Sequence, residues 1–309
     1  MLYFLPWPIL LPLNLCLMAF NILLCATPVL AVACFRLLLP FRWAQVLAER
    51  CNYGSYRMFA VLNAMAIALT NRIEWDVRGN DFAPVHRSCI IICNHLSWAD
   101  IVLLCHIYRG RIPTMKFFLK KSLLYIPVLG QACWGLGMPF LNRYSRAQLI
   151  RNPALRARDL ESTRRACRRL SYAPLALINF VEGTRYTPQK AALANSPYRH
   201  LMVPKSPALA IAMGELGHEI EALFNTTLCY RDNARHPFID LLMGRMKSVY
   251  ARIERLENTE DLIGNYLEDK HFKHDFGMRL RELWAQKDTQ LDAYLSQSAP
   301  ESAPEVSAG

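Results

Sequence analysis

Hydrophobic positions dominate the start of the chain, where no charged side chain occurs before Arg36. Within this start, Leu13–Phe35 is a mostly apolar stretch of 23 residues. At ~1.5 Å per residue, a helix of that length can cross the ~30 Å hydrocarbon core of a bilayer. The stretch is bordered or interrupted by Pro12, Asn14, Asn21 and Pro28. Because such residues disfavour a straight span, a kinked or re-entrant helix is an alternative.

A second apolar run, Met58–Leu69, is too short to cross a bilayer and predicts a short interfacial helix. Positive charges begin only after the first stretch, at Arg36, Arg42, Arg50 and Arg57. If the first stretch spans a membrane, the positive-inside rule places the rest of the chain in the cytoplasm. We therefore expect residues 1–70 to be a membrane-associated helical segment. A buried helix pair in a soluble protein is the alternative.

After Asn71, short β-rich runs alternate with helical ones. The predicted strands are Ile73–Val77, Cys89–Cys93, Ile112–Phe118, Leu175–Val181, Leu201–Val203, Ala222–Tyr230 and Val249–Ile253. This alternation predicts an α/β domain over residues 71–295, with a mostly parallel mixed sheet flanked by helices. Residues 296–309 are rich in Ser, Pro and Ala and predict a disordered tail.

Composition narrows the class of protein. With 53% hydrophobic and 20% charged residues, the chain as a whole is not disordered. Its ten cysteines are scattered without a CxxC pair, which favours reduced thiols over a disulfide framework. The net charge of +11 is concentrated in a basic belt, Arg109–Arg169, with 14 basic and two acidic side chains. Such a belt indicates a localised anionic partner.

The buried strand Cys89–Cys93 leads into His95, and a predicted helix, Ser97–Ile107, carries Asp100 in its first turn. The end of a strand that opens into a helix is where open α/β sheets bind ligands. A histidine oriented by a carboxylate is a general base, because the carboxylate fixes its tautomer and stabilises the imidazolium.

Other interpretations of this segment remain. Ser97 and Asp100 match a capping box, and His95 can be a packed histidine near a strand end. Cys89, Cys93 and His95 are possible metal ligands, but no second ligand pair has suitable spacing, so zinc is disfavoured. Ser97 lacks the flanking glycines of a nucleophile elbow.

A second motif, Glu182-Gly183-Thr184-Arg185, stands where another predicted strand breaks into a loop. Gly183 permits an unusual backbone, Arg185 offers a planar fork for a phosphate, and Glu182 can hold that fork. A glycine turn with a local ion pair is the simpler alternative.

Taken together, the motifs resemble those of the 1-acylglycerol-3-phosphate (PlsC-like) glycerolipid acyltransferases. That family carries, in order, NHxxxxD, KxxLxxxPxxG, FxxR, EGTR and V-P-(K/R) blocks. The matching positions are Asn94-His95…Asp100, Lys120…Leu123…Pro127…Gly130, Phe140…Arg143, Glu182–Arg185 and Val203-Pro204-Lys205. The run EGTRYTPQK and the neighbouring belt resemble the bacterial YihG-type subgroup. Lys205-Ser206-Pro207 departs from the family pattern, in which Arg-Thr or Arg-Ser is often followed by Gly.

The resemblance implies roles for these residues. His95 would take a proton from a glycerol hydroxyl, Asp100 would orient His95, and Lys120 would stabilise the developing oxyanion. The implied phosphate site comprises Arg143, Glu182, Gly183, Thr184 and Arg185. No metal or bound cofactor is implied, and acyl-CoA or acyl carrier protein would be the co-substrate. The implied reaction converts a lysophospholipid, above all lysophosphatidic acid, at the cytoplasmic face of a bacterial inner membrane.

Within the belt, four arginines form a stripe on a predicted amphipathic helix: Arg164, Arg165, Arg168 and Arg169. We expect this stripe to dock membrane phospholipids or the phosphorylated donor, since basic residues near a membrane are attracted to anionic headgroups. A solvated charged face is the simpler interpretation, and nucleic acid is disfavoured because no recognised motif occurs. Two other functions stay open: a non-catalytic protein that binds anionic membranes, and an acyl-thioester hydrolase.

Overall fold

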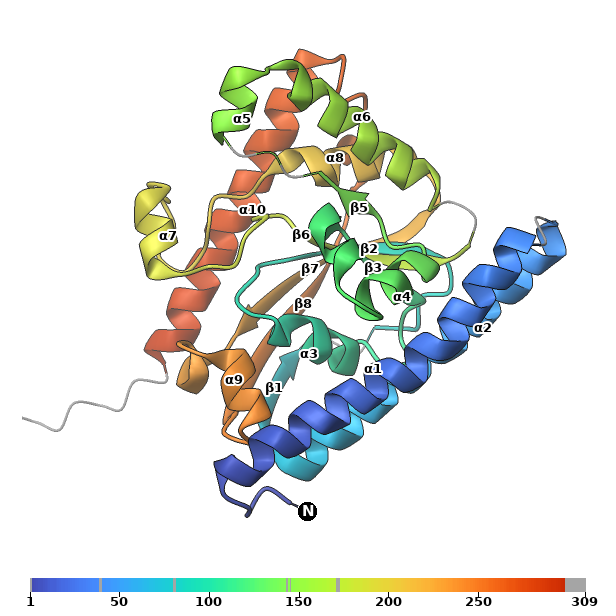
Figure 1. Cartoon of the computed structure of the whole chain (residues 1–309). Coiled ribbons are helices and arrows are strands. Elements are labelled where there is room, and N and C mark those ends of the chain that lie inside the picture. Colours follow the sequence, from blue (N-terminus) through green and yellow to red (C-terminus); the bar gives the residue numbers. More distant parts are fainter. Residues whose placement is uncertain are drawn as a thin grey trace, which may run out of the picture.

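The computed structural model describes residues 2–38, 41–79, 82–142, 144, 146–170 and 173–297 (Figure 1). It begins with two long helices, α1 (Trp7–Leu38) and α2 (Arg42–Thr70), which lie side by side along one side of the body. It ends with helix α10 (Lys270–Ser296). From residue 298 on, the predicted disordered tail lies outside the described residues.

Helix α2 has 29 residues and is much longer than the short helix predicted from its apolar half. The polar segment Cys51–Arg57 breaks the apolar pattern but stays helical, because its polar groups find partners. Asn52 Nδ2 donates a hydrogen bond to Gly135 O at 3.3 Å, and Ser55 Oγ donates to Cys51 O at 3.1 Å. Tertiary contacts therefore extend a helix that local pattern alone would end.

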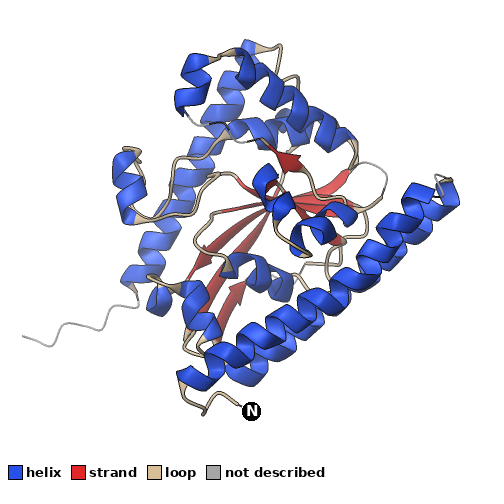
Figure 2. Cartoon of the chain, in the orientation of Figure 1, coloured by secondary structure: helices blue, strands red, loops and turns tan. Residues whose placement is uncertain are grey.

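The strands of the main sheet are drawn red in Figure 2. The sheet has six strands in the order β1-β8-β7-β2-β6-β3. Their bounds are β1 (Glu74–Arg78), β2 (Ser88–Cys93), β3 (Thr114–Phe117), β6 (Leu175–Phe180), β7 (Ile220–Cys229) and β8 (Ser248–Leu256). Four of the five strand pairs are parallel and only β7–β8 is antiparallel, which confirms the predicted mixed sheet. The predicted strand Leu201–Val203 is wrong: this segment is irregular.

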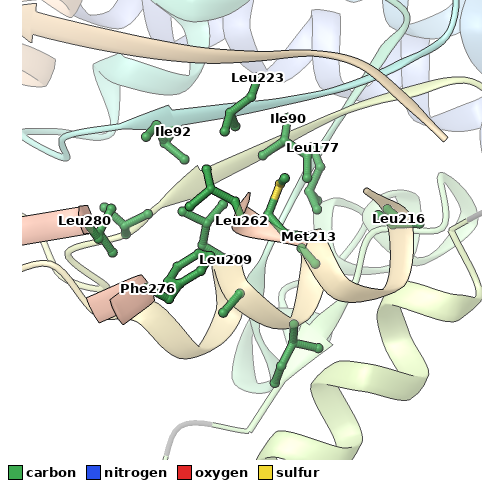
Figure 3. Close-up of a cluster of buried hydrophobic side chains, with 14 of the residues drawn as sticks. Ile90, Ile92, Leu177, Leu209, Met213, Leu216, Leu223, Leu262, Phe276 and Leu280 are labelled. Atoms are coloured by element: carbon green, nitrogen blue, oxygen red, sulfur yellow. The ribbon is translucent and has the colours of Figure 1, made fainter. Parts of the chain in front are cut away.

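The sequence CIIIC is apolar at every position because it forms β2, where both faces of the sheet are covered. Ile90 and Ile92 pack with α8 (Ser206–Leu216) and α10 on one face, as Figure 3 shows. Cys89, Ile91 and Cys93 pack on the other face, with α3 (Ala99–Ile107) and α2. The site described below lies at the end of this doubly covered strand.

The shorter elements complete the chain. They are β4 (Leu119–Lys120), η1 (Lys121–Tyr125), α4 (Leu129–Gly135), β5 (Phe140–Leu141), α5 (Arg146–Arg151), α6 (Ala154–Arg168), α7 (Pro188–Leu193), η2 (Arg231–Asn233), α9 (Pro237–Leu242) and η3 (Glu260–Leu262). Strands β4 and β5 form a separate two-stranded sheet.

Candidate active site

Three neighbouring parallel strands carry the candidate catalytic groups to one edge of the sheet. In the register of the sheet, Cys93 at the end of β2 is paired with Phe180 of β6 and with Thr226 of β7. The residues that follow these strands therefore meet, as expected for the carboxyl ends of parallel strands. They include His95 after β2, Glu182 after β6 and Tyr230 after β7.

His95 and Asp100 form a hydrogen-bonded pair, with 2.7 Å between Nδ1 and Asp100 Oδ2. The Asp100 side chain is fully buried, whereas His95 keeps 18% of its side-chain surface exposed. The Asp100 carboxylate also accepts hydrogen bonds from Leu96 N at 2.7 Å, Ser97 N at 3.0 Å and Tyr230 Oη at 2.7 Å. A carboxylate surrounded by donors directs the His95 proton to Nδ1, which leaves Nε2 as the basic nitrogen.

Half of the capping box expected for Ser97 and Asp100 is present, because Ser97 N donates to the Asp100 carboxylate, whereas Ser97 Oγ accepts from Ala99 N at 3.3 Å and the N-cap of α3 is Trp98. The same carboxylate thus begins helix α3 and orients His95. The cysteines of β2 serve the core: burial raises the pKa of Cys89 to about 12. In the described part of the chain, no cluster of three or more His, Cys, Asp or Glu side chains could hold a metal ion.

Glu182 is almost fully buried, with 1% of its surface exposed. Its carboxylate accepts hydrogen bonds from His95 N at 3.0 Å, Met202 N at 3.0 Å and Trp284 Nε1 at 3.3 Å. Burial raises the pKa of Glu182 to about 7, while these hydrogen bonds oppose that rise. We had expected this carboxylate to hold the Arg185 fork. It instead holds the backbone of His95, because Gly183 turns the chain between the two residues.

The loop after Glu182 contacts His95 a second time, since Tyr186 N donates to His95 O at 2.7 Å. Gly183 makes this return possible with a φ of +67°, a value that favours glycine. We call these two contacts, Glu182 to His95 N and Tyr186 to His95 O, the His95 clamp. The clamp brings together two motifs that lie 87 residues apart.

The cations of the implied phosphate site differ in how they are placed. Arg185 is exposed, and its guanidinium lies 5.1 Å from the centre of the Trp98 ring, at the start of α3. Thr184 is half-buried in the same loop. Arg143 lies outside the described residues. Lys120 is exposed on β4, where it is paired with Leu141 of β5, so the KxxL and FxxR motifs lie side by side.

An apolar cavity of about 190 Å³ lies between helices α1 to α3 and the sheet. Its lining includes Ile22 and Ala26 of α1, Phe59 of α2, Ile101 and Cys105 of α3, and Phe117 of β3. Phe117 stacks on Phe180 at 6.1 Å, and Phe180 stacks on His95 at 4.1 Å between ring centroids. Phe180 therefore separates Phe117, in the wall of the cavity, from the imidazole.

The KxxLxxxPxxG motif builds another wall of this cavity, through Leu123, Ile126, Leu129 and Gly130. Gly130 has a steric reason to be glycine. A Cβ there would lie 2.3 Å from Leu124 O, far inside van der Waals contact. The motif thus has a structural role beyond Lys120.

The arginine stripe is partly engaged within the protein. On α6, Arg164 and Arg168 contact the carboxylate of Glu215 on α8, at 2.5 Å and 2.7 Å. Arg165 lies 3.8 Å from Glu161 on its own helix. Two of the four arginines therefore join α6 to α8, and docking by the stripe stays a prediction.

Sequence reasoning missed several residues of the site. Tyr230 and Trp284 are separated from their partners by 130 and 102 residues, and no local pattern marks them. Asn94 was noted only as part of a motif. Its buried amide accepts from Leu228 N at 2.8 Å and donates to Leu228 O at 2.9 Å, which fixes the end of β2 against β7.

Comparison with known proteins gives a consistent result. A family model described as "Acyltransferase" matches residues 74–220. The chain is 25% identical over 259 residues to the 2-acyl-1-lysophosphatidylinositol acyltransferase of Saccharomyces cerevisiae, covering 70% of this chain and 64% of that protein. It is 24% identical over 226 residues to the 1-acyl-sn-glycerol-3-phosphate acyltransferase 3 of Arabidopsis thaliana, covering 67% of this chain and 54% of that protein.

Among solved structures, the chain is similar to the 1-acyl-sn-glycerophosphate (LPA) acyltransferase PlsC from Thermotoga maritima. The two align with a TM-score of 0.48 and 15% sequence identity, over 94% of this chain and 99% of that one. The chain spans less than two thirds of the length of both curated relatives described above.

Proposed function

We propose that this chain, which is similar to acyltransferases over residues 74–220, belongs to the PlsC-like acyltransferase family and transfers a fatty acyl group from a thioester to the free hydroxyl of a lysophospholipid. The acceptor is lysophosphatidic acid and the donor is acyl-CoA or acyl carrier protein. The observation that carries the proposal is the His95–Asp100 pair, held at the edge of the sheet beside an apolar cavity.

His95 acts as the general base in this proposal. Its Nε2 takes the proton of the acceptor hydroxyl, and the oxygen attacks the thioester carbonyl, forming the new C–O bond. When the tetrahedral intermediate collapses, the C–S bond breaks and the leaving thiolate takes the proton back from His95. Asp100 stabilises the imidazolium between these steps. The enzyme forms no covalent intermediate.

Arg185 binds the acceptor phosphate, since it is an exposed fork fixed in place by the Trp98 ring. The His95 clamp holds its loop directly against the base, so a phosphate on Arg185 brings the neighbouring hydroxyl within reach of His95. Arg143 completes the phosphate site and Lys120 stabilises the oxyanion.

A donor and acceptor panel tests this function. Purified protein in lipid vesicles is given acyl-CoA or acyl carrier protein with lysophosphatidic acid, lysophosphatidylinositol or no acceptor, and the lipid products are read by mass spectrometry. We expect thiol release that depends on lysophosphatidic acid and forms phosphatidic acid. Thiol release without an acceptor would instead identify a hydrolase, and tight vesicle binding with no thiol release would identify a binding protein.

The apolar cavity accommodates the acyl chain of the donor, because stacked rings connect its wall to the imidazole and its lining is almost entirely apolar. Replacing Ala26, a buried α1 residue of its wall, with phenylalanine should shorten the cavity. We expect the rate with long acyl chains to fall at least about tenfold relative to short ones, since loss of a few buried methylenes costs ~0.8 kcal/mol each. Competition among donors of different chain length measures this preference.

Ala31→Phe is the matched control, because Ala31 lies on the exposed face of the same helix. It should leave the chain-length preference unchanged. An equal shift in both variants would show that the cavity does not hold the acyl chain.

Helix α1 attaches the enzyme to the membrane by lying along its surface. In the described part of the chain, α1 alone is long and apolar enough to cross a bilayer. It contacts the body at widely separated points, however. Asn14 Nδ2 donates to Leu242 O of α9 at 2.8 Å, and Val29 packs so closely on Gly135 that a Cβ there would lie 2.8 Å from Val29 Cγ1. A spanning helix would project away from the body.

Two exposed cysteines of α1, Cys16 and Cys34, can test this orientation. They are separated by 18 residues, or about 27 Å along a helix. If α1 lies in the plane of the membrane, nitroxide labels at the two positions should sit within about one helical turn (~5.4 Å) of the same depth. Power-saturation EPR on single-cysteine variants in vesicles measures the depth. Labels on opposite sides of the bilayer would show that α1 spans it.

A further inference from the structure

Helix α10 lies outside the matched family region, which ends at residue 220, yet it contacts the site. Two of its side chains, Trp284 and Lys287, are fully buried between the helix and the sheet. Trp284 Nε1 donates to the Glu182 carboxylate at 3.3 Å. Lys287 Nζ lies 4.4 Å from the centre of the Trp284 ring and donates to Thr226 O at 2.6 Å.

Burying a lysine costs free energy, because its ammonium group is removed from water. A fully buried lysine is therefore expected to have interactions that compensate for this cost. The surrounding cluster on this face of the sheet is otherwise hydrophobic, and includes Phe276, Leu280 and Leu291 of the same helix. An apolar residue at position 287 would extend that cluster. The position of Lys287 instead completes a chain of contacts, from Thr226 O through Lys287 and the Trp284 ring to Glu182 and then His95 N.

We propose that Trp284 and Lys287 are positioning residues for the transfer reaction, which together keep the Glu182 carboxylate ionised under the backbone of His95. Trp284 supplies a neutral donor to that carboxylate, and Lys287 supplies the buried countercharge. This inference rests on the proposed function and extends the catalytic unit to the C-terminal helix.

The electrostatics support this arrangement. Burial raises the pKa of Glu182 to about 7, and its hydrogen bond from Trp284 and the charge of Lys287 both act in the opposite direction. Burial likewise lowers the pKa of Lys287 to about 8, while Cys93, Glu182 and Glu254 of β8 oppose that change. The other titratable groups that interact with Glu182 are Cys93 of β2 and Tyr186 of the following loop. Asp100 of α3 also faces Cys93.

The ionised state matters because a charged carboxylate accepts from all three of its donors. When Glu182 is protonated, one oxygen carries a proton and becomes a poorer acceptor, so the donors on His95 and Met202 are no longer both satisfied. The clamp then loosens. Removing either Trp284 Nε1 or the Lys287 charge raises the pKa of Glu182, and the protonated form persists to higher pH.

Trp284→Phe and Lys287→Met test the proposal, since each removes one polar group and keeps most of the volume. We expect the acidic limb of the kcat profile to move up by about one pH unit in each variant, so that the rate near pH 6 falls about tenfold and the rate near pH 8 changes little. KM for the acceptor should stay within about threefold, because neither residue touches the phosphate.

Two controls separate positioning from general packing. Leu280→Val, on the same buried face of α10, should lower the melting temperature without moving the acidic limb. In a Glu182→Gln background, residue 182 has no carboxylate to titrate, so Trp284→Phe should not move the acidic limb of the kcat profile further. If Trp284→Phe or Lys287→Met folds and is active but the acidic limb of its kcat profile does not move, the proposal is wrong. If one of the two variants fails to fold, the result for the other tests the proposal.

A readout independent of turnover separates this inference from the proposed function. Carbon-13 NMR of glutamate-labelled protein, with Glu182→Gln to identify the signal, gives the pKa of Glu182 directly. A higher pKa in Trp284→Phe supports the positioning role even if no acyl transfer is found, and an equal pKa rejects it. Absence of transfer by the wild-type protein across the donor and acceptor panel rejects the proposed function alone.

Discussion

Replacing His95 with alanine should lower kcat for acyl transfer by about 10²–10⁴-fold, the usual contribution of a general base. The effect is large because no other basic nitrogen is held by the Asp100 carboxylate in the described part of the chain. KM for the donor should change little, since the cavity is lined by other side chains. Initial rates at saturating lysophosphatidic acid and acyl-CoA measure the loss.

The stability of His95→Ala should remain close to that of the wild type. The variant loses the stacking of His95 on Phe180, worth about 0.5–1.5 kcal/mol, and the hydrogen bond to the buried Asp100, worth about as much again, so we expect the melting temperature to fall by several degrees. His106→Ala is the matched control, because His106 stacks on Trp75 with a similar centroid distance of 4.3 Å. That variant should lose a similar amount of stability and keep its activity. Wild-type rates in His95→Ala would rule out the proposed mechanism.

Asp100→Asn should reduce kcat by a similar factor, about 10²–10⁴-fold, although the change is only from oxygen to nitrogen. The new amide group is a donor and cannot accept from Leu96 N or Ser97 N, both of which approach Oδ2. The amide must therefore keep its oxygen at the Oδ2 position, which also faces His95 Nδ1, and place its nitrogen at the Oδ1 position, opposite Tyr230 Oη. The hydrogen bond to Nδ1 is kept, but the negative charge that stabilises the imidazolium is lost.

Tyr230→Phe provides the graded comparison, since it removes a single donor from Asp100 Oδ1 and leaves the His95 contact in place. One hydrogen bond is worth about 0.5–1.5 kcal/mol, so we expect a loss of activity of at most about tenfold. Parallel measurement of kcat and of thermal unfolding in both variants tests the ranking. Equal effects of Asp100→Asn and Tyr230→Phe would show that the negative charge of Asp100 is unimportant.

The sequence predicted those parts of the fold and site that depend on neighbouring residues. The strand Cys89–Cys93 was found because both of its faces are buried, which leaves a continuous apolar run. His95 and Asp100 were found because they flank the junction of a strand and a helix only five residues apart. Local patterns also indicated the turn at Gly183.

Contacts between distant segments were not predicted. Glu182 was expected to hold Arg185, three positions away, and instead binds His95 N, which belongs to another strand end. No motif or pattern in the sequence marks Lys287, yet it is fully buried. The contacts of Glu182 and Lys287 depend on the order of the strands and on the packing of α10. The periodicity of hydrophobic residues along the chain carries no information about strand order or helix packing.

The His95 clamp also bears on how the acceptor range of such an enzyme can be changed. Because Glu182 and Tyr186 hold the N–H and the C=O of the same residue, His95, substitutions at these positions would displace the base together with the binding loop. Thr184, which is half-buried, and Arg185, which is exposed, lie between them, so their side chains can vary while the backbone of the loop stays fixed. Mutant libraries aimed at new acceptor headgroups are therefore best confined to these two positions, where substitutions change headgroup binding without displacing His95.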